Sequence, residues 1–145
     1  MTKIKIAIAG ALGRMGKNLI SSCLSNEKVE IIGVFDALEI PNNFLNLVGL
    51  NEKTILDKEK CFEAADVVID FTSPNALFSF SESAVATNTS LVVGTTGLEE
   101  KHFKLLEQTG QSTKVFYAPN MSFGVNSFFE LARKATSHLK KFDVE

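Results

Sequence analysis

The sequence predicts an α/β fold in which a mainly parallel sheet is covered by helices on both faces. Short apolar runs rich in β-branched residues alternate along the chain with longer amphipathic stretches, a pattern typical of βαβ units. The composition agrees, because 45% apolar residues, 22% charged residues and three prolines in 145 residues are ordinary for a globular domain. We therefore expect one doubly wound domain with its own core.

Five apolar runs have the length and the β-branched content of buried strands. They are residues 4–9, 29–35, 67–71, 90–93 and 115–117. Residues 55–56 suggest a further short strand. Residues 37–53 are less regular, and we expect a loop with a short helix or strand around residues 44–50.

The stretches between these runs predict helices. They are residues 14–25, 58–65, 74–87, 99–109 and 125–139. In the first of them the apolar residues recur at the spacing of one helical face. Ser73 and Pro74 favour the start of the third, since Ser can cap free amides and Pro at the first helical position has no amide to lose.

A glycine-rich turn follows the first predicted strand and opens the first predicted helix. Gly10, Gly13 and Gly16 are spaced G-x-x-G-x-x-G, whereas the usual dinucleotide fingerprint has one residue between its first two glycines. At this position the amides and the positive dipole end of the helix can face a pyrophosphate. A Walker A loop is excluded, because the glycine spacing differs and Asn18 stands where Ser or Thr is needed. A turn that serves only strand-to-helix packing is the alternative.

Asp36 ends the second predicted strand, twenty residues beyond Gly16. From there a carboxylate can accept hydrogen bonds from the adenosine ribose of a dinucleotide. Strand, glycine turn, helix, strand and acid together favour a Rossmann-like doubly wound fold that binds NAD(P). The acid would repel the 2′-phosphate of NADP, and residues 37–38 bring no cation to offset it. NADH is therefore the preferred cofactor, while Arg14 and Lys17 keep NADPH possible.

Two later turns leave strand ends in the same region of the predicted sheet. Gly94-Thr95-Thr96 follows a strand beyond the topological switch, so its amides and hydroxyls would face the nicotinamide end of a dinucleotide. A capping turn before the next helix explains this segment equally well. Ala118-Pro119-Asn120-Met121-Ser122 leaves the last strand. Asn120 could hold the nicotinamide carboxamide, and a simple turn is the alternative.

The other polar and sulfur-containing residues carry less functional signal. Asp70 ends a predicted buried strand, and we expect it to accept hydrogen bonds rather than to catalyse. His102 and His138 fall on polar helix positions, where we expect solvated side chains. Cys23 and Cys61 lie 38 residues apart with no Cys or His at metal-ligand spacing, so neither a metal site nor a disulfide framework is predicted. Cys23 is expected to fill core space.

Charge excludes nucleic acid and membranes as partners. Lys and Arg number 15 against 17 Asp and Glu, which gives a net charge of −2 and no basic field for either surface. The apolar run after Lys5 is broken by Arg14, which leaves it at the short limit of a signal peptide and far below the roughly 20 residues that span a bilayer. We therefore expect a cytoplasmic protein.

Four segments, taken together, resemble one enzyme family. They are residues 7–16 (AIAGALGRMG), 68–74 (VIDFTSP), 93–97 (VGTTG) and 118–126 (APNMSFGVN). In this order and spacing they resemble the 4-hydroxy-tetrahydrodipicolinate reductases, also called dihydrodipicolinate reductases, over essentially the whole chain. The resemblance implies reduction, by NADH or NADPH, of a small-molecule heterocycle on the diaminopimelate route to lysine. The family often has a basic residue after its ribose-binding acid, and Ala37 at this position strengthens the NADH preference.

The resemblance also implies which residues bind the cofactor. The loop after the first strand would hold the pyrophosphate, Asp36 the ribose, and the two later turns the nicotinamide and its approach to substrate. The implied cofactor-binding residues are Gly10, Ala11, Leu12, Gly13, Arg14, Met15, Asp36, Gly94, Thr95, Thr96, Ala118, Pro119, Asn120 and Met121.

The resemblance divides the chain into an NAD(P)-binding domain at residues 1–124 and, at 125–145, a helix with the start of a crossover to a substrate domain. In the family that domain opens with a His-rich segment containing the general acid and a substrate-binding Lys, and this sequence stops at Glu145, where that segment should begin. No catalytic residue is assigned. A C-terminal stretch that completes the dinucleotide domain, and the sheet that forms the family's homotetramers, would also be missing. We expect the 145-residue chain to bind NADH weakly and to turn over nothing.

Two other functions are weighed against this one. The first is a stand-alone nucleotide-binding regulatory module without catalysis. Another two-domain oxidoreductase, such as an aspartate-semialdehyde or amino-acid dehydrogenase, is disfavoured by residues 94–97 and 120–126.

Overall fold

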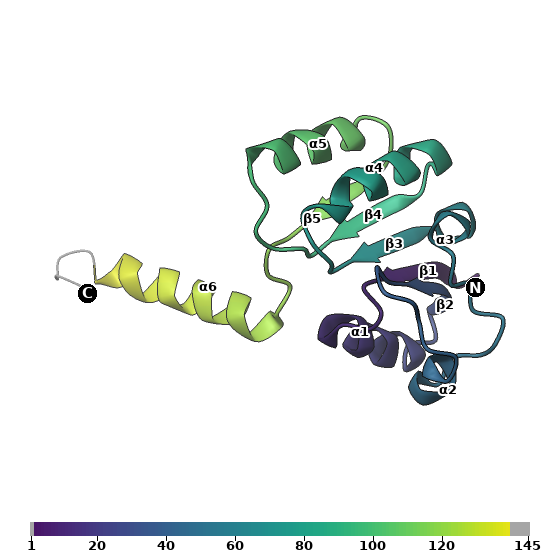
Figure 1. The fold of residues 1–145 in the computed structure, drawn as a ribbon. Helices are drawn as coiled ribbons and strands as arrows, with labels where there is room; N and C mark the ends of the chain where they lie inside the picture. The colour runs from purple at the N-terminus through teal and green to yellow at the C-terminus, as the bar shows by residue number, and fades with distance from the viewer. Residues whose placement is uncertain (1, 140–145) are drawn as a thin grey trace.

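A computed structural model describes residues 2–139 of the chain, and its centre is one parallel sheet (Figure 1). The strands lie in the order β2-β1-β3-β4-β5. Their bounds are β1 Ile4–Ala9, β2 Val29–Phe35, β3 Val67–Asp70, β4 Ser90–Val93 and β5 Val115–Tyr117. Because β2 pairs with one side of β1 and β3 with the other, the topological switch of a doubly wound sheet lies at β1.

The predicted strands are confirmed, four of them with the predicted bounds. The third ends one residue early, at Asp70. The short strand predicted at residues 55–56 is only a single bridge between Gly33 and Ile55, in which the amide of Val34 donates to the carbonyl of Ile55 over 2.8 Å.

Within residues 2–139, six helices connect and flank the strands. They are α1 Arg14–Leu24, α2 Phe44–Val48, α3 Lys58–Ala64, α4 Ala76–Thr87, α5 Glu100–Gly110 and α6 Phe123–His138. The expected helix start at Ser73-Pro74 is wrong by two residues, because Pro74 and Asn75 form a turn and Asn75 is the N-cap. Helix α6 begins two residues before its predicted start, since the Ser122 hydroxyl accepts the amide N–H of Val125 and caps the helix. The predicted boundary at 124/125 therefore falls in the first turn of α6.

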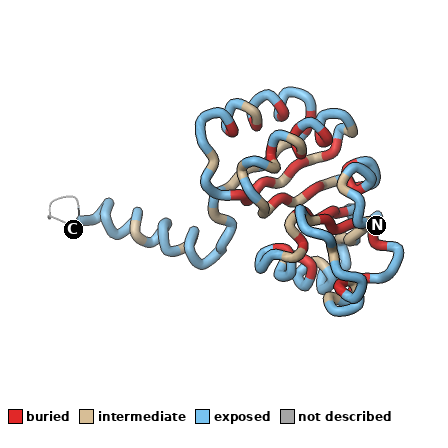
Figure 2. The backbone as a smooth tube through the Cα atoms, viewed as in Figure 1, coloured by how far each residue is buried: buried red, intermediate tan, exposed pale blue. Residues whose placement is uncertain are grey.

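The sheet separates two hydrophobic cores, and neighbouring residues of β1 point into different ones. Helices α3, α4 and α5 cover one face, where Ala7 lies in a cluster with Phe62 and Leu77. Helices α1 and α2 cover the other face, where Ile8 packs in a cluster with Ile20 and other side chains (Figures 1 and 2). This alternation confirms the prediction of helices on both faces.

The second face is covered only in part. Among the residues of β3, β4 and β5 that point to it are Ile69, Val92 and Phe116. Ile69 and Val92 are half-buried, and the side chain of Phe116 is 57% exposed. Helix α1 lies over β1 and β2 instead, and α2 packs beside α1. An apolar strip of the sheet thus stays open beside α1.

Helix α6 projects away from the sheet (Figure 1). No residue of it is buried, and it packs on no other described helix or strand. Its large apolar side chains are exposed, with Phe128 65% exposed and Leu131 66% exposed. The continuation expected at residues 140–145 lies outside the described residues. None of the helices within residues 2–139 has the length and apolar character needed to cross a membrane.

Candidate functional site

The sequence motifs meet at the carboxyl edge of the sheet, because all five strands are parallel. The glycine turn follows β1, Asp36 follows β2, Phe71 and Thr72 follow β3, and Gly94 follows β4. In open α/β sheets ligands bind beyond this edge, at the topological switch. The predicted site residues, which belong to four separate segments of the chain, are thereby brought to one side of the molecule.

The glycine turn is closely packed, and two of its glycines have no room for a side chain. A Cβ on Gly16 would overlap the Gly10 carbonyl and would lie 2.7 Å from the Cα of Ala11. Gly10 has φ +74°, and a Cβ there would lie 2.9 Å from the Thr72 Cγ2. The amide of Gly10 donates to the carbonyl of Phe35 over 2.9 Å. The turn is therefore held by residues at the ends of β2 and β3, the two strands beside β1.

Helix α1 begins directly after this turn with uncapped amides. Gly13 is its N-cap and has no side chain to accept from the first turn, which also contains no acidic residue. The first amides of a helix have no acceptor within the helix, so those of Arg14, Met15 and Gly16 remain available to an external anion. The positive end of the helix dipole adds to their attraction for negative charge.

The carboxylate of Asp36 is tied to the same turn. Its Oδ2 accepts the amide N–H of Leu12 over 2.9 Å, and its Oδ1 accepts that of Leu38 over 3.2 Å. Each oxygen keeps a further acceptor position. The acid is therefore held in place by backbone groups and can still accept hydrogen bonds from a diol.

On the other side of the switch, Asp70 is completely buried and joins two loops. Its Oδ1 accepts from both the amide and the hydroxyl of Thr72, over 2.9 and 2.6 Å, and its Oδ2 accepts from the hydroxyl of Thr95 over 3.1 Å. Burial raises the pKa of this carboxyl, and the bonds from Thr72 and Thr95 oppose that rise. Asp70 is thus the hydrogen-bond acceptor that the sequence predicted.

Gly94 lies directly under an aromatic ring. A Cβ at this position would overlap the Phe71 ring and would lie 2.8 Å from its Cδ1, so only glycine permits this contact without a shift. The sequence motif singled out Gly94, but it did not single out Phe71 or Thr72 as parts of the site. Only the pairing of β3 with β4 brings these residues together.

The turn after β5 is held by its own side chains. Asn120 Oδ1 accepts the amide N–H of Ser122 over 2.8 Å, and the Asn126 side-chain amide donates to the carbonyls of Asn120 and Ser122. The amide of Ala118 donates to the carbonyl of Val93 over 3.1 Å. These bonds hold residues 118–122 in a turn, and Asn120 also lines a cleft.

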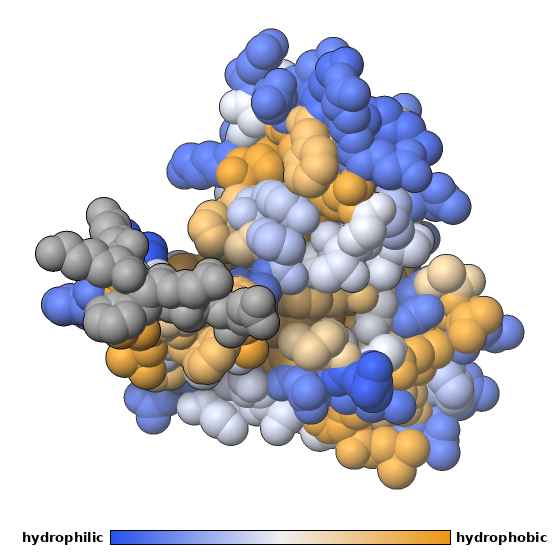
Figure 3. Space-filling model, turned by 90° about the vertical axis from the view of Figure 1, so that its left-hand side faces the viewer, coloured by the Kyte–Doolittle hydropathy of each residue, from blue (hydrophilic) through white to orange (hydrophobic). Residues whose placement is uncertain are grey.

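That cleft has a volume of about 640 Å³, the size of a small-molecule site. Its walls come from α1, from the open strip of the sheet and from the loops after β3, β4 and β5. The lining residues are Met15, Leu19, Ile69, Phe71, Thr72, Val92, Gly94, Thr95, Thr96, Pro119, Asn120, Met121 and Ser122. Figure 3, which views the side on which α6 leaves the domain, shows apolar side chains in a hollow there. Asp36 and residues 10–14 lie outside the cleft lining, beside it at the same edge of the sheet.

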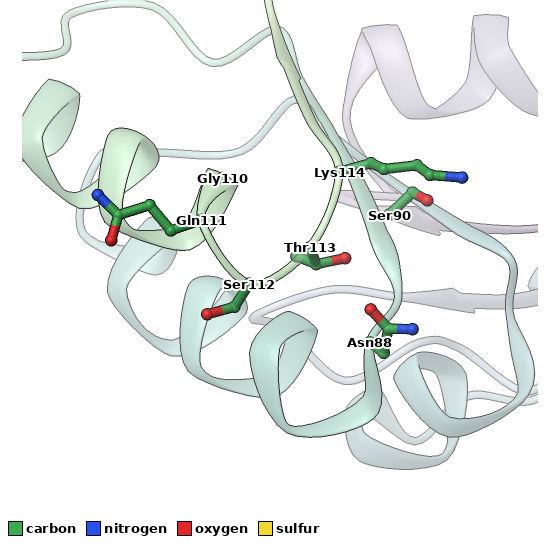
Figure 4. Close-up of a pocket in the computed structure, with 7 residues that line it drawn as sticks. All are labelled: Asn88, Ser90, Gly110, Gln111, Ser112, Thr113 and Lys114. Carbon is green, nitrogen blue, oxygen red and sulfur yellow. The ribbon is translucent and has the colours of Figure 1, made fainter.

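A second hollow, of about 330 Å³, lies at the opposite edge of the sheet (Figure 4). It is formed by residues that precede β4 and β5 and by the end of α5. Thr113 and Lys114 are among its lining residues. None of the predicted cofactor residues lies there, and none of the sequence motifs leads to it. We therefore assign the site to the larger cleft.

One predicted surface residue is buried. His102 was expected to be solvated, but its side chain is 2% exposed. Its Nδ1 accepts the amide N–H of Glu99 over 2.9 Å, and its ring lies 5.5 Å from that of Phe78. The first turn of α5 faces α4, which is why a residue at a polar helix position became core.

His138 is exposed as expected, and Cys23 is half-buried against the core beneath α1. Within residues 2–139 no three His, Cys, Asp or Glu side chains gather as they would around a metal ion.

A parallel sheet with a glycine turn after β1, an acid after β2 and a cleft beyond the switch defines the Rossmann-like class of domains. Residues 4–121 match the family described as "Dihydrodipicolinate reductase, N-terminus". The chain belongs to this family.

Two similar proteins agree with this membership. The chain is 36% identical to a 4-hydroxy-tetrahydrodipicolinate reductase from Rickettsia akari and 38% identical to one from Campylobacter jejuni, covering 98% of this chain and 52% of each relative. The chain thus spans about half the length of these relatives.

Solved structures show the same fold. A dihydrodipicolinate reductase from Paenisporosarcina sp. TG-14 with bound dipicolinate has a TM-score of 0.71 and 25% identity, covering 93% of this chain and 54% of that one. GenD2 from gentamicin A biosynthesis, solved in complex with NAD, has a TM-score of 0.64 and 17% identity over 83% of this chain and 35% of that one. The second likeness concerns the fold alone.

Proposed function

We propose that this chain is the dinucleotide-binding half of a 4-hydroxy-tetrahydrodipicolinate reductase. One hydrogen bond carries the proposal. Asp36 accepts the amide N–H of Leu12, which joins the acid to the glycine turn at the edge of the sheet where the cleft opens. This arrangement offers a diol acceptor and an anion site side by side, which are the two features that the adenosine ribose and the pyrophosphate of a dinucleotide require.

The residues present fit such a cofactor. Protein atoms fill the space that a Cβ on Gly10 or Gly16 would need, so these glycines allow the turn to pack closely, and the uncapped amides at the start of α1 remain available to a phosphate. Beyond the switch, Gly94, Thr95 and Thr96 reach the cleft with Asn120 and Met121. In this proposal Gly10 to Met15 hold the pyrophosphate, Asp36 the ribose, Gly94 to Thr96 the nicotinamide, and Ala118 to Met121 its approach to substrate.

NADH is the cofactor that we propose to be preferred over NADPH. The two oxygens of Asp36 point to the backbone amides of Leu12 and Leu38, which hold the negative charge where the 2′-phosphate of NADPH would come. Ala37 is exposed and carries no charge. The preference therefore follows from one fixed carboxylate that is not balanced by a neighbouring cation on this turn.

The work of this half of the enzyme would be orientation and electrostatics. A bound reduced nicotinamide would supply the hydride. The cleft residues would fix its position relative to substrate, and the apolar strip of Ile69 and Val92 would exclude water from one side of the cleft. We assign no proton donor among residues 2–139, because the buried carboxyl of Asp70 is already engaged by Thr72 and Thr95.

The exposed apolar surfaces support a second half. We propose that residues 125–145 lead into a substrate domain, and that a returning segment covers the part of the open strip at Phe116, which lies outside the cleft lining. The relatives are about twice as long as this chain, so they contain the additional residues that such a domain and segment require. The tetramer of the full-length family and a cytoplasmic location are parts of the same proposal.

Calorimetric titration of the 145-residue chain with NADH, NADPH, ATP and CoA tests the cofactor proposal. We expect NADH to bind, NADPH to bind more weakly, and ATP and CoA to bind weakest. Tight binding of ATP or CoA without binding of NADH would instead support a nucleotide-binding regulatory module. Reductase activity of the homogeneous 145-residue chain would contradict the proposal that catalysis needs the second half.

A further inference from the structure

The carboxylate of Asp70 is not accessible from the cleft. Its relative exposure is 0%, so it cannot touch a molecule in the cleft. The ion pairs of the described residues are formed by other acids. Burying an acid without a cation is costly unless hydrogen bonds satisfy it, and here three of them do.

The partners of Asp70 belong to two loops that line the cleft. Thr72 lies in the loop after β3, and Thr95 lies in the loop after β4. The Thr95 hydroxyl donates to Asp70 and accepts the amide N–H of Thr72 over 3.0 Å. The carboxylate and the hydroxyl therefore form one closed network between the loops, and removing either would loosen both.

The network sets the position of groups that do face the cleft. Phe71 precedes Thr72 and Gly94 precedes Thr95, and the Phe71 ring lies directly against Gly94. All four residues line the cleft. A change in the bonds to Asp70 would therefore shift the cleft wall beyond the switch, while the glycine turn and Asp36 keep their own bonds to Phe35 and Leu12.

We propose that Asp70 is a positioning residue that acts through Thr72 and Thr95 to hold the two loops in the arrangement that binds the nicotinamide end of the cofactor. This inference rests on the proposed function. It assigns to Asp70 no contact with cofactor or substrate.

The Asp70→Asn variant tests the inference, because it keeps the shape of the side chain and turns one acceptor into a donor. Calorimetry would compare NADH with ADP-ribose, which lacks the nicotinamide. We expect the Kd for NADH to rise about tenfold, the order of magnitude expected for one lost hydrogen bond to a charged group, and the Kd for ADP-ribose to change less than about twofold. The readout is the Kd for NADH divided by the Kd for ADP-ribose.

Thr113→Val is the matched control. The buried Thr113 hydroxyl donates to the carbonyl of Thr89 over 3.0 Å, at the opposite edge of the sheet. Its loss is expected to lower stability without changing the ratio.

If Asp70→Asn does not fold, the Thr72→Val variant removes one donor to Asp70 and is expected to raise the ratio. The Thr72→Ser variant keeps the hydroxyl and is expected to have the wild-type ratio.

An equal loss of both ligands in Asp70→Asn, no loss of either, or a changed ratio in Thr113→Val would overturn this inference alone. The same holds if Thr72→Val leaves the ratio unchanged in the case where Asp70→Asn does not fold. A wild-type chain that binds neither NADH nor ADP-ribose would overturn the proposed function and this inference together.

Discussion

The carboxylate of Asp36 accepts the amide N–H of Leu12 over 2.9 Å, which joins the end of β2 to the glycine turn after β1. A residue that sequence spacing places near a ribose is thus also part of the turn that would hold the pyrophosphate. Changes at Asp36 should therefore affect both the affinity for a dinucleotide and its discrimination at the 2′ position.

Replacement of Asp36 by Ala is predicted to raise the Kd for NADH by about tenfold or more, since hydrogen bonds to a charged group contribute about 1.5–3 kcal/mol. The Kd for NADPH should rise less, because the repulsion of its 2′-phosphate is also lost. Fluorescence titration with both cofactors measures the two values. Glu39→Ala, which removes an exposed acid three residues further on, is the control, and an unchanged NADH to NADPH ratio in Asp36→Ala would contradict the assignment.

Replacement of Gly16 by Ala should destabilise the fold by about 1–3 kcal/mol, the usual cost of overpacking. The added Cβ would meet backbone atoms of Gly10 and Ala11, which cannot move without shifting the turn. Gly110→Ala is the matched variant, because a Cβ there meets nothing within 4 Å, and we expect it to be neutral or to stabilise by up to about 1 kcal/mol. Urea unfolding of the two variants provides the comparison, and equal stabilities would contradict the close packing of the turn.

The aromatic core beneath α3 predicts a large stability effect at Phe62. Its ring is fully buried, with centroids 6.0 Å from those of both Phe35 and Phe80. Phe62→Ala should lower the free energy of unfolding by about 3–5 kcal/mol. The same change at Phe128 on α6, which is 65% exposed, should stay within about 0.5 kcal/mol of wild type. A large loss at Phe128 would show that α6 packs in the isolated chain.

Cys61 is predicted to be unreactive in the folded chain. Its side chain is buried and donates to the carbonyl of Ile55 over 3.5 Å, and burial raises the pKa of the thiol to about 12. In a Cys23→Ser background, an aromatic disulfide reagent at pH 8 should modify Cys61 only at the rate of unfolding. Fast modification under native conditions would show that the thiol is accessible.

The same thiol predicts an alkaline loss of stability. Its folded-state pKa lies above the ordinary value of 9.0, so between these values the native chain binds a proton that the unfolded chain has released, and the free energy of unfolding falls as the pH rises. Cys61→Ala should show a shallower fall above pH 9 than wild type in urea unfolding. Equal slopes would argue against the raised pKa.

The elements of this fold were largely predictable from local patterns, whereas contacts between elements were not. The β-branched runs at β1, β2, β4 and β5 gave the strand bounds directly. The burial of His102 depends on the packing of α5 against α4, and its polar helix position carries no sign of it. The open strip beside α1 likewise follows from which strands a helix covers.

In the site, too, local features were predictable and contacts between elements were not. Glycine spacing and the position of Asp36 predicted the turn and the acid, because both reflect requirements of the backbone at one place in the chain. The contact of Phe71 with Gly94 and the bonds of Asp70 to Thr95 join segments more than twenty residues apart. Only the parallel pairing of β3 with β4 creates them.

The most direct test of where a dinucleotide binds is a map of backbone amide shifts in the isotopically labelled chain during titration with NADH. The two hollows lie at opposite edges of the sheet, so their amides report separately. The site described above predicts shifts at Gly10 to Gly16 and at Gly94 to Thr96, with no shift at Gly110 to Lys114. Shifts centred on Gly110 to Lys114, or none at the glycine turn at saturating NADH, would contradict it.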